Sequence, residues 1–286
     1  MNQVYKIVTD RIISEMENGR IPWIKTWSGV DPSNVISGKP YKGINKLMLG
    51  FASTQYGNGW FLTPKQANDL GGKIKNGEKA SMGVFWKIYN SRIKSDIEND
   101  EIEQIEKRFV LRYYNLFNIS QCENLKLPEH CNTTTTKLTT QKPNDIYRSY
   151  IQREQIVEGY GKPSYSPSQD IIRMPNIDQF TNENAFFATA FHETIHSTGH
   201  IKRLARFDIK NIAHFGSETY SKEELVAEIG SSFLCEYSGI ANAMTEQNNI
   251  GYLQSWIQVL KNDPKMIIFA ASKAEKATEY IIGATS

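Results

Sequence analysis

Apolar side chains recur at helical spacing near the start of the chain. Val4, Val8, Ile12 and Met16 follow one another every four residues and therefore share one face of a helix. An apolar stripe of this kind is typical of a helix that packs on a core. We expect an amphipathic N-terminal helix that ends near Gly19.

Stretches rich in aromatic and β-branched residues predict strands in the first half. Residues 84–89 and 109–117 have this composition. The charged residues 92–107 between them are predicted to form a solvated connection or an extension of the same hairpin. Residues 47–52 are apolar enough for a short buried helix or strand. Residues 64–70 are predicted to form a short helix, which the Gly-Gly pair after it ends.

The second half of the chain is predicted to be mostly helical. Residues 165–174 are the exception, because they alternate between apolar and polar side chains as a strand does. Apolar periodicity, caps and glycine stops mark the helices. These helices are expected over residues 144–158, 181–198, 221–237, 249–260 and 264–282.

A polar, threonine-rich segment separates the two halves. Residues 120–145 contain too few apolar side chains to order themselves against a core of their own. We therefore expect three parts: a first domain of residues 1–125, a linker of residues 126–145 and a second domain of residues 146–286.

Charge divides the chain unevenly. Residues 1–95 hold 14 Lys and Arg against 6 Asp and Glu, and residues 96–286 hold 19 against 25. The first part therefore carries a net charge of +8 and the rest −6, so one end can attract a polyanion. A basic solvated face is the simpler interpretation of the same numbers.

Composition also indicates the compartment. The chain has no run of 18 apolar residues and no apolar core of a secretory signal at its start. Its three cysteines are too few and too scattered for a disulfide framework. We expect a cytoplasmic protein without a membrane partner; its oligomeric state is left open.

The sequence AFHETIHSTGH contains the pattern H-E-x-x-H. His192 and His196 are four residues apart, so on a helix both imidazoles lie on one face and can reach a single Zn²⁺ ion. Glu193 lies beside them and is predicted to act as the general base. The expected cofactor is Zn²⁺, with another divalent transition metal as the alternative. His200 follows Gly199 directly, which is the wrong spacing for a third histidine ligand.

A third ligand is expected from the downstream segment SKEELVAEIGSSF. Glu224 and Glu228 are four residues apart and share a helix face. The pattern E-L-V-A-E resembles a helix of thermolysin-like zincins, which implies that Glu224 binds the metal and that Glu228 orients a ligand histidine. Ser221 and Glu224 also match a capping box, in which Glu224 would turn back to its helix terminus. Glu228 is then the alternative ligand.

The first half mixes aromatic side chains with lysines, as surfaces that bind single-stranded nucleic acid do. Aromatic rings stack on bases and lysines follow the phosphates. Core packing is the competing interpretation for the tryptophans, of which we expect about half to be buried. The candidate DNA-binding residues are Lys25, Lys42, Lys46, Lys65, Lys73, Lys75, Lys79, Trp23, Trp27 and Trp60.

Longer stretches of the sequence resemble a known family. PYKGINKLML, TPKQANDLGGKIKNGEKASMGVFW and YYNLFNISQCENL are similar to the N-terminal domain of ArdC-type antirestriction proteins. YSPSQDIIRMPNIDQF, FFATAFHETIHSTGHIKRLAR and FGSETYSKEELVAEIGSSFLC are similar to their metallopeptidase-like domain, as is the C-terminal IGYLQSWIQVLKNDPKMIIFAASKAEKATEYIIG. The resemblance lapses in residues 129–143.

The resemblance implies a protein of plasmids, phages and other mobile elements that protects incoming DNA from host restriction, particularly during conjugation. It implies a single-stranded-DNA-binding domain and a zincin-like domain in which His192 and His196 are metal ligands and Glu193 is the catalytic acid/base. We thus expect an α+β protein: a small mixed α/β DNA-binding domain, and a mostly helical zincin-like metallopeptidase domain with a small sheet.

The expected partners are single-stranded DNA and an unidentified protein substrate, which a zinc-dependent metallopeptidase site would cleave. Two alternatives remain: a DNA-anchored metalloprotease that acts as a toxin or regulator, and a non-catalytic DNA-binding protein whose metal is structural. A nuclease is disfavoured, because the sequence shows no acidic cluster for two metal ions.

Overall fold

The structure, a computed structural model, describes most of the chain. It covers residues 3–23, 31–97, 100–132, 141–151, 153–206, 218–240 and 250–283. Two of the expected DNA-binding residues, Lys25 and Trp27, lie outside these ranges.

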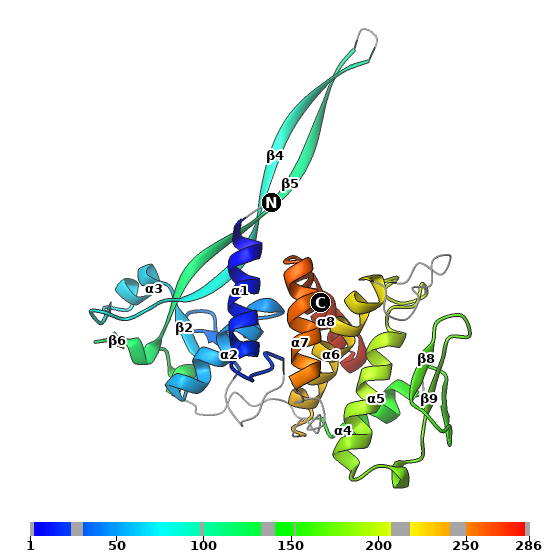
Figure 1. The fold of residues 1–286 in the computed structure, drawn as a ribbon. Helices are drawn as coiled ribbons and strands as arrows, with labels where there is room; N and C mark the ends of the chain where they lie inside the picture. The colour runs from blue at the N-terminus through cyan, green and yellow to red at the C-terminus, as the bar shows by residue number, and fades with distance from the viewer. Residues whose placement is uncertain are drawn as a thin grey trace.

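The first half surrounds a small mixed sheet (Figure 1). Its strands lie in the order β1-β2-β5-β4, with β1 parallel to β2 and the other pairs antiparallel. A second, two-stranded sheet pairs β3 with β6. The helices are α1 (Gln3–Glu17), α2 (Ile44–Tyr56) and α3 (Pro64–Asp69), with the 3-10 turns Ile119–Gln121 and Glu129–Asn132. The strands are β1 (Ser33–Asn34), β2 (Trp60–Leu62), β3 (Lys73–Ile74), β4 (Ser81–Ile97), β5 (Asp100–Asn118) and β6 (Cys122–Glu123).

Strands β4 and β5 form a long antiparallel ribbon that projects from the body (Figure 1). The predicted strands at 84–89 and 109–117 are therefore confirmed. The charged residues between them extend the hairpin, since the pairing continues to Ile97 and Asp100. The predicted N-terminal helix is confirmed as α1, and residues 47–52 lie in the helix α2.

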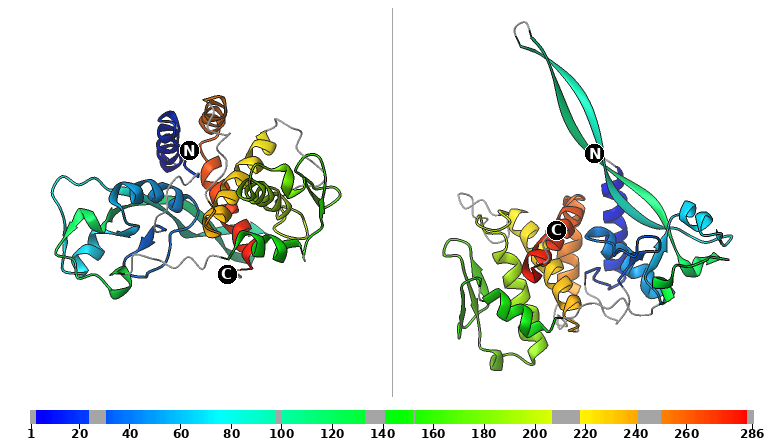
Figure 2. Two further views of the ribbon diagram at one scale, coloured as in Figure 1. Left: turned by 90° about the horizontal axis from the view of Figure 1, so that it is seen from below. Right: turned by 180° about the vertical axis from the view of Figure 1, so that it is seen from behind.

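The second half is a helical layer with a small three-stranded sheet at its side (Figures 1 and 2). Helix α6 packs between α5 and α8, and the sheet β7-β9-β8 lies against α5. The helices are α4 (Pro143–Ile151), α5 (Glu183–Ser197), α6 (Glu218–Tyr237), α7 (Ile250–Asn262) and α8 (Met266–Ile282), with a 3-10 turn over Ile177–Gln179. The strands are β7 (Ile156–Glu158), β8 (Ser164–Ser166) and β9 (Ile171–Met174).

Two predicted elements in this half are corrected by the structure. The strand expected over residues 165–174 is two strands, β8 and β9, because the chain turns back at Asp170, where φ is 54°. The helix expected over residues 144–158 ends at Ile151, and Ile156 then pairs with Ile172 in the sheet. The neighbouring Ile156 and Val157 are β-branched and favour a strand.

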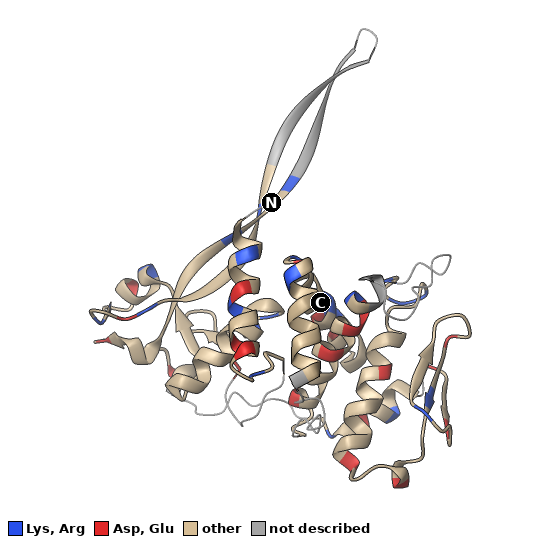
Figure 3. Cartoon of the chain, in the orientation of Figure 1, with Lys and Arg blue, Asp and Glu red and all other residues tan. Residues whose placement is uncertain are grey.

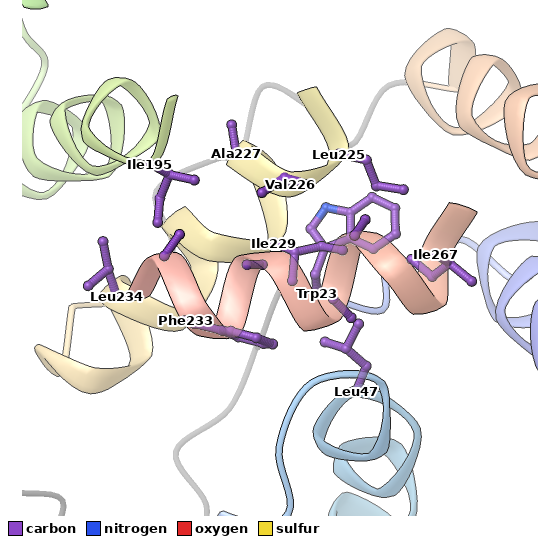
Figure 4. Close-up of a cluster of buried hydrophobic side chains, with 14 of the residues drawn as sticks. Trp23, Leu47, Ile195, Leu225, Val226, Ala227, Ile229, Phe233, Leu234 and Ile267 are labelled. Atoms are coloured by element: carbon purple, nitrogen blue, oxygen red, sulfur yellow. The ribbon is translucent and has the colours of Figure 1, made fainter. Parts of the chain in front are cut away.

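One hydrophobic core joins the two halves (Figure 4). Trp23 and Leu47 come from the first half, and they pack against Ile229 and Phe233 of α6 and Ile267 of α8. Helix α1 also lies against α7 (Figure 2), where the Thr9 hydroxyl donates to the carbonyl of Pro264. The domain division expected around residues 126–145 stays a proposal.

None of the described helices is both long and apolar enough to cross a bilayer.

Candidate metal centre

Helix α5 holds the two histidines of the H-E-x-x-H pattern on one side. The Asn182 side chain caps the helix by accepting from the amide of Ala185 at 2.9 Å. Further along, Phe187 and Phe191 are buried and fix the face that points to the core. His192 and His196 lie one turn apart with their Nε2 atoms 3.1 Å from each other, so both nitrogens face the same point.

Helix α6 approaches α5 closely because small residues line the contact. A Cβ on Gly230 would come within 2.6 Å of Ile195 Cδ1, so only glycine fits there without displacing Ile195. The Ser231 hydroxyl, which is buried, donates to the carbonyl of Ala188 in α5. Small side chains on α6 therefore let the two helices pack closely.

Glu224 of α6 completes the cluster. Its Oε2 lies 3.5 Å from His192 Nε2, and its Oε1 lies 3.4 Å from His196 Nε2. In the described part of the chain, these residues form the group whose donor atoms all lie within 4.8 Å of one another. Two ligands bound tetrahedrally at 2.0–2.1 Å from Zn²⁺ stand about 3.3 Å apart. The three spacings therefore fit a single small divalent ion.

The capping-box alternative for Glu224 does not form. Helix α6 begins at Glu218, so Ser221 lies inside the helix and Glu224 is in its second turn. The carboxylate is therefore free of the helix terminus and faces the histidines.

The charge of this cluster suits a cation. Burial by itself would lower the pKa of His196, but the carboxylates of Glu223 and Glu224 outweigh it and raise that pKa to about 10. Burial would raise the pKa of Glu224, but the two histidines hold it well below its usual range. The negative charge that keeps a proton on His196 also favours a divalent ion in its place.

Glu193 and Glu228 are both buried, at 8% and 6% exposure. Neither belongs to the cluster of ligand atoms. Burial, together with the charge of Glu228, raises the pKa of the Tyr252 hydroxyl, which places Glu228 beside that ring. His192 Nδ1 is buried and has no hydrogen-bond partner among the described residues. The predicted role of Glu228 in orienting a ligand histidine stays a proposal.

The neighbour of the second histidine is Glu223, which the sequence analysis did not single out. Its Oε1 lies 3.6 Å from His196 Nδ1, on the side of the ring away from the cluster. Arg206 donates two hydrogen bonds to this carboxylate, from Nε to Oε2 at 3.1 Å and from Nη2 to Oε1 at 2.7 Å. Arg206 also donates to Thr198 and to the carbonyl of Ile195. It therefore ties the end of α5 to α6.

His200 lies outside the cluster of candidate ligands, as its spacing from His196 in the sequence predicted. It is buried, with Nδ1 3.4 Å from Asp170 Oδ2. Asp170 in turn pairs with Arg203, whose guanidinium is also held by Glu154 and by the hydroxyl of Tyr165. This network packs the segment after α5 onto the small sheet.

The expected DNA-binding residues are scattered, and several are buried or paired. Trp23 is 2% exposed and Trp60 4%, so neither ring is open to a base in this structure; both fill core positions. Lys46 lies between Asp31 and Glu236, with Nζ at 3.6 and 3.0 Å from their carboxylates. These three residues therefore leave the candidate DNA surface.

The other lysines lie at the surface. Lys42 pairs with Glu279, Lys73 pairs with Glu123 at 3.1 Å, and Lys75 donates to the carbonyl of Ser120. Lys65 is exposed, and Lys79 lines an open hollow beside α2. The hollow is also lined by Arg11, Arg20 and Tyr56.

Two protein-family models match this chain. The model for the N-terminal domain of the anti-restriction factor ArdC matches residues 2–117. The model for a zincin-like metallopeptidase matches residues 150–273, which include all three residues of the cluster.

Two crystal structures of the antirestriction ArdC protein from plasmid R388 resemble the whole chain. The metal-free structure is 31% identical with a TM-score of 0.75, and the match covers 97% of this chain and 96% of that one. The Mn(II)-bound structure gives the same identity and TM-score, over 98% and 97% of the two chains.

Curated relatives extend the comparison. A DNA primase TraC from Escherichia coli is 32% identical over 96% of this chain, and the uncharacterized protein y4eC from Sinorhizobium fredii is 29% identical over 97%. The chain spans 26% of the length of that primase and 20% of a second TraC primase. From the match to R388 ArdC along almost the whole of both chains, the protein belongs to the ArdC family of antirestriction proteins and combines its N-terminal domain with a zincin-like domain.

Proposed function

We propose that this chain is an antirestriction protein of a mobile element that binds single-stranded DNA and uses a metal-dependent peptidase-like site. The observation that carries the metal site is the convergence of His192, His196 and Glu224, with donor atoms 3.1–3.5 Å apart. The plasmid origin of R388 ArdC and the Mn(II) in its crystal structure support the mobile element and the divalent ion.

His192, His196 and Glu224 would hold the ion, for which we retain Zn²⁺ as the expected metal. When bound, the metal would polarise a peptide carbonyl and make water a stronger nucleophile at neutral pH. Glu193 follows His192 directly on α5 and is our candidate to take the proton from the attacking water and pass it to the leaving amine. Buried apolar residues of α5, such as Phe187 and Phe191, would keep bulk water from the inner side of the helix.

The DNA-binding part of the proposal rests on charge. Residues 1–95 carry a net charge of +8, and exposed Lys65 and the hollow lined by Arg11 and Lys79 place some of it on the surface. Arg20 of the same hollow pairs with Glu15. Such a surface attracts the phosphates of a nucleic acid without reading its sequence. The DNA primases among the relatives also act on DNA, which supports the same class of partner.

The metal site is tested by metal analysis of the purified protein and of Glu224→Ala and Glu228→Ala. The wild type and Glu228→Ala should retain an equimolar divalent metal after dialysis, while Glu224→Ala should lose it. Full retention by Glu224→Ala would remove Glu224 from the ligand set.

Glu193→Gln separates catalysis from binding. It should keep the metal and the affinity for DNA but lose protection of incoming DNA in a restricting host, because the general base is gone. Full protection by this variant, with its metal retained, would favour the non-catalytic alternative.

A further inference from the structure

The base of the β4–β5 ribbon exposes an unusual number of large side chains. The described side chains reach Tyr89 on β4 and resume at Arg108 on β5. Only two strands are paired in this stretch, and the face that carries Trp86 and buried Leu111 packs in part against α1 and α8. Basic residues mark the same part of the ribbon in Figure 3.

The pairing register sorts these side chains onto two different faces. Phe85 pairs with Arg112, Lys87 with Val110, and Tyr89 with Arg108, so these six residues share one face, which we call the basic face.

The opposite face of the ribbon carries no charge in its described part. Trp86, Ile88, Phe109 and Tyr113 alternate with the residues of the basic face and are 41–59% exposed. All three cations of the described ribbon base therefore lie on one side.

On the basic face, cations and rings contact one another. Phe85 is 42% exposed and Tyr89 36%. Lys87 Nζ lies 5.1 Å from the centre of the Tyr89 ring, and Arg112 Nη2 donates to the Tyr89 hydroxyl at 3.2 Å. The contacts keep the cations beside an exposed aromatic surface, which is the composition of a platform for unpaired bases.

These cations differ from three of the lysines expected to bind DNA. Lys42, Lys46 and Lys73 each pair with a carboxylate, which cancels their charge toward a phosphate. Among the side chains that the structure describes, no carboxylate pairs with Lys87 or Arg112. Their charge is therefore available to a polyanion.

We propose that single-stranded DNA lies along the basic face of the β4–β5 ribbon, with bases stacked on Phe85 and Tyr89 and phosphates held by Lys87 and Arg112. This rests on the proposed DNA-binding function and gives it a location. A single strand fits better than a duplex, because exposed rings can stack only on bases that are not paired.

The test compares paired variants of the full chain by fluorescence anisotropy with a labelled oligothymidine at several salt concentrations. Lys87→Glu with Arg112→Glu should weaken binding and lower the slope of log K against log salt by about 1.4, since each lost phosphate contact on a single strand removes about 0.7. Lys273→Glu with Lys276→Glu makes the same change of charge on exposed positions of α8 and should leave the slope unchanged.

A second pair of variants tests what the aromatic rings contribute to DNA binding. Tyr89→Ala should weaken binding roughly ten-fold by loss of one stacked base. Tyr113→Ala removes the same side chain from the opposite face of the same ribbon and should bind within about two-fold of the wild type. Unchanged thermal melting of each variant controls for folding.

The outcomes separate the two levels of the proposal. A wild type that does not bind oligothymidine would overturn both the DNA-binding function and this surface. Wild-type binding with ribbon variants equal to their controls would overturn the ribbon alone. Equal competition by duplex DNA would overturn the assignment to single strands.

Discussion

At the scale of single residues, Glu223 lies behind His196, beside the ring nitrogen that points away from the other candidate ligand atoms. Carboxylates behind a ligand imidazole fix the ring and make it a better donor. Arg206 holds Glu223 at two points, so this carboxylate is fixed before a metal arrives.

Glu223→Gln should lower metal affinity about 10–100-fold, because the amide keeps the shape but not the charge behind His196. Chelator competition measures the affinity. Glu183→Gln removes a carboxylate from the exposed first turn of α5 and should leave the affinity unchanged. Equal affinities of the two variants would leave Glu223 with no role toward the metal.

Sequence reasoning worked at this scale where the geometry is local. His192 and His196 could be placed together because four residues on a helix make one turn. Glu223 could not be assigned, since its partner Arg206 lies 17 residues away in the sequence. Trp23 and Trp60 show the other limit: composition indicates aromatic residues but not whether the fold turns them inward.

At the scale of elements, the packing of α6 on α5 determines the spacing of the ligands. Gly230 lets the helices approach until Ile195 fills the space that a side chain would need. The turn that splits β8 from β9 could not be predicted, because it depends on a positive φ at Asp170 that the alternation of apolar and polar residues does not reveal.

Gly230→Ala should destabilise the protein by a net of about 1–2 kcal/mol, because overpacking against Ile195 outweighs the better helix propensity of alanine. Gly50→Ala is the control: this glycine also lies within a helix, α2, but a Cβ there meets no atom within 4 Å. That variant should gain about 0.5–1 kcal/mol. Chemical denaturation measures both, and a stabilised Gly230→Ala would contradict the packing argument.

At the scale of the molecule, the two halves of the sequence share one core. Trp23 and Leu47 pack among side chains of α6 and α8 (Figure 4), and Lys46 reaches Glu236. Two domains were predicted because the threonine-rich segment interrupts the pattern of apolar and polar positions along the chain. That pattern carries no information on which surfaces of the two halves meet in space.

A protease site placed between residues 133 and 140 should give two fragments that remain together in gel filtration, because the buried contacts between the halves do not depend on that peptide link. Lys46→Glu should loosen the cleaved complex by setting a third carboxylate beside Asp31 and Glu236. The same change at exposed Lys65 should not. Separation of the unmodified fragments under native conditions would refute the shared core.

Helix α6 carries Glu224 in its second turn and Glu236 in its last, about 18 Å apart along a single rigid element. Glu224 at one end faces the histidines, and Glu236 at the other end pairs with Lys46 of the basic half. Any coupling free energy between binding events at the two ends of this helix is reciprocal by thermodynamic linkage. If binding of a nucleic acid changes the affinity for the metal ion by some factor, binding of the ion must change the affinity for the nucleic acid by that same factor.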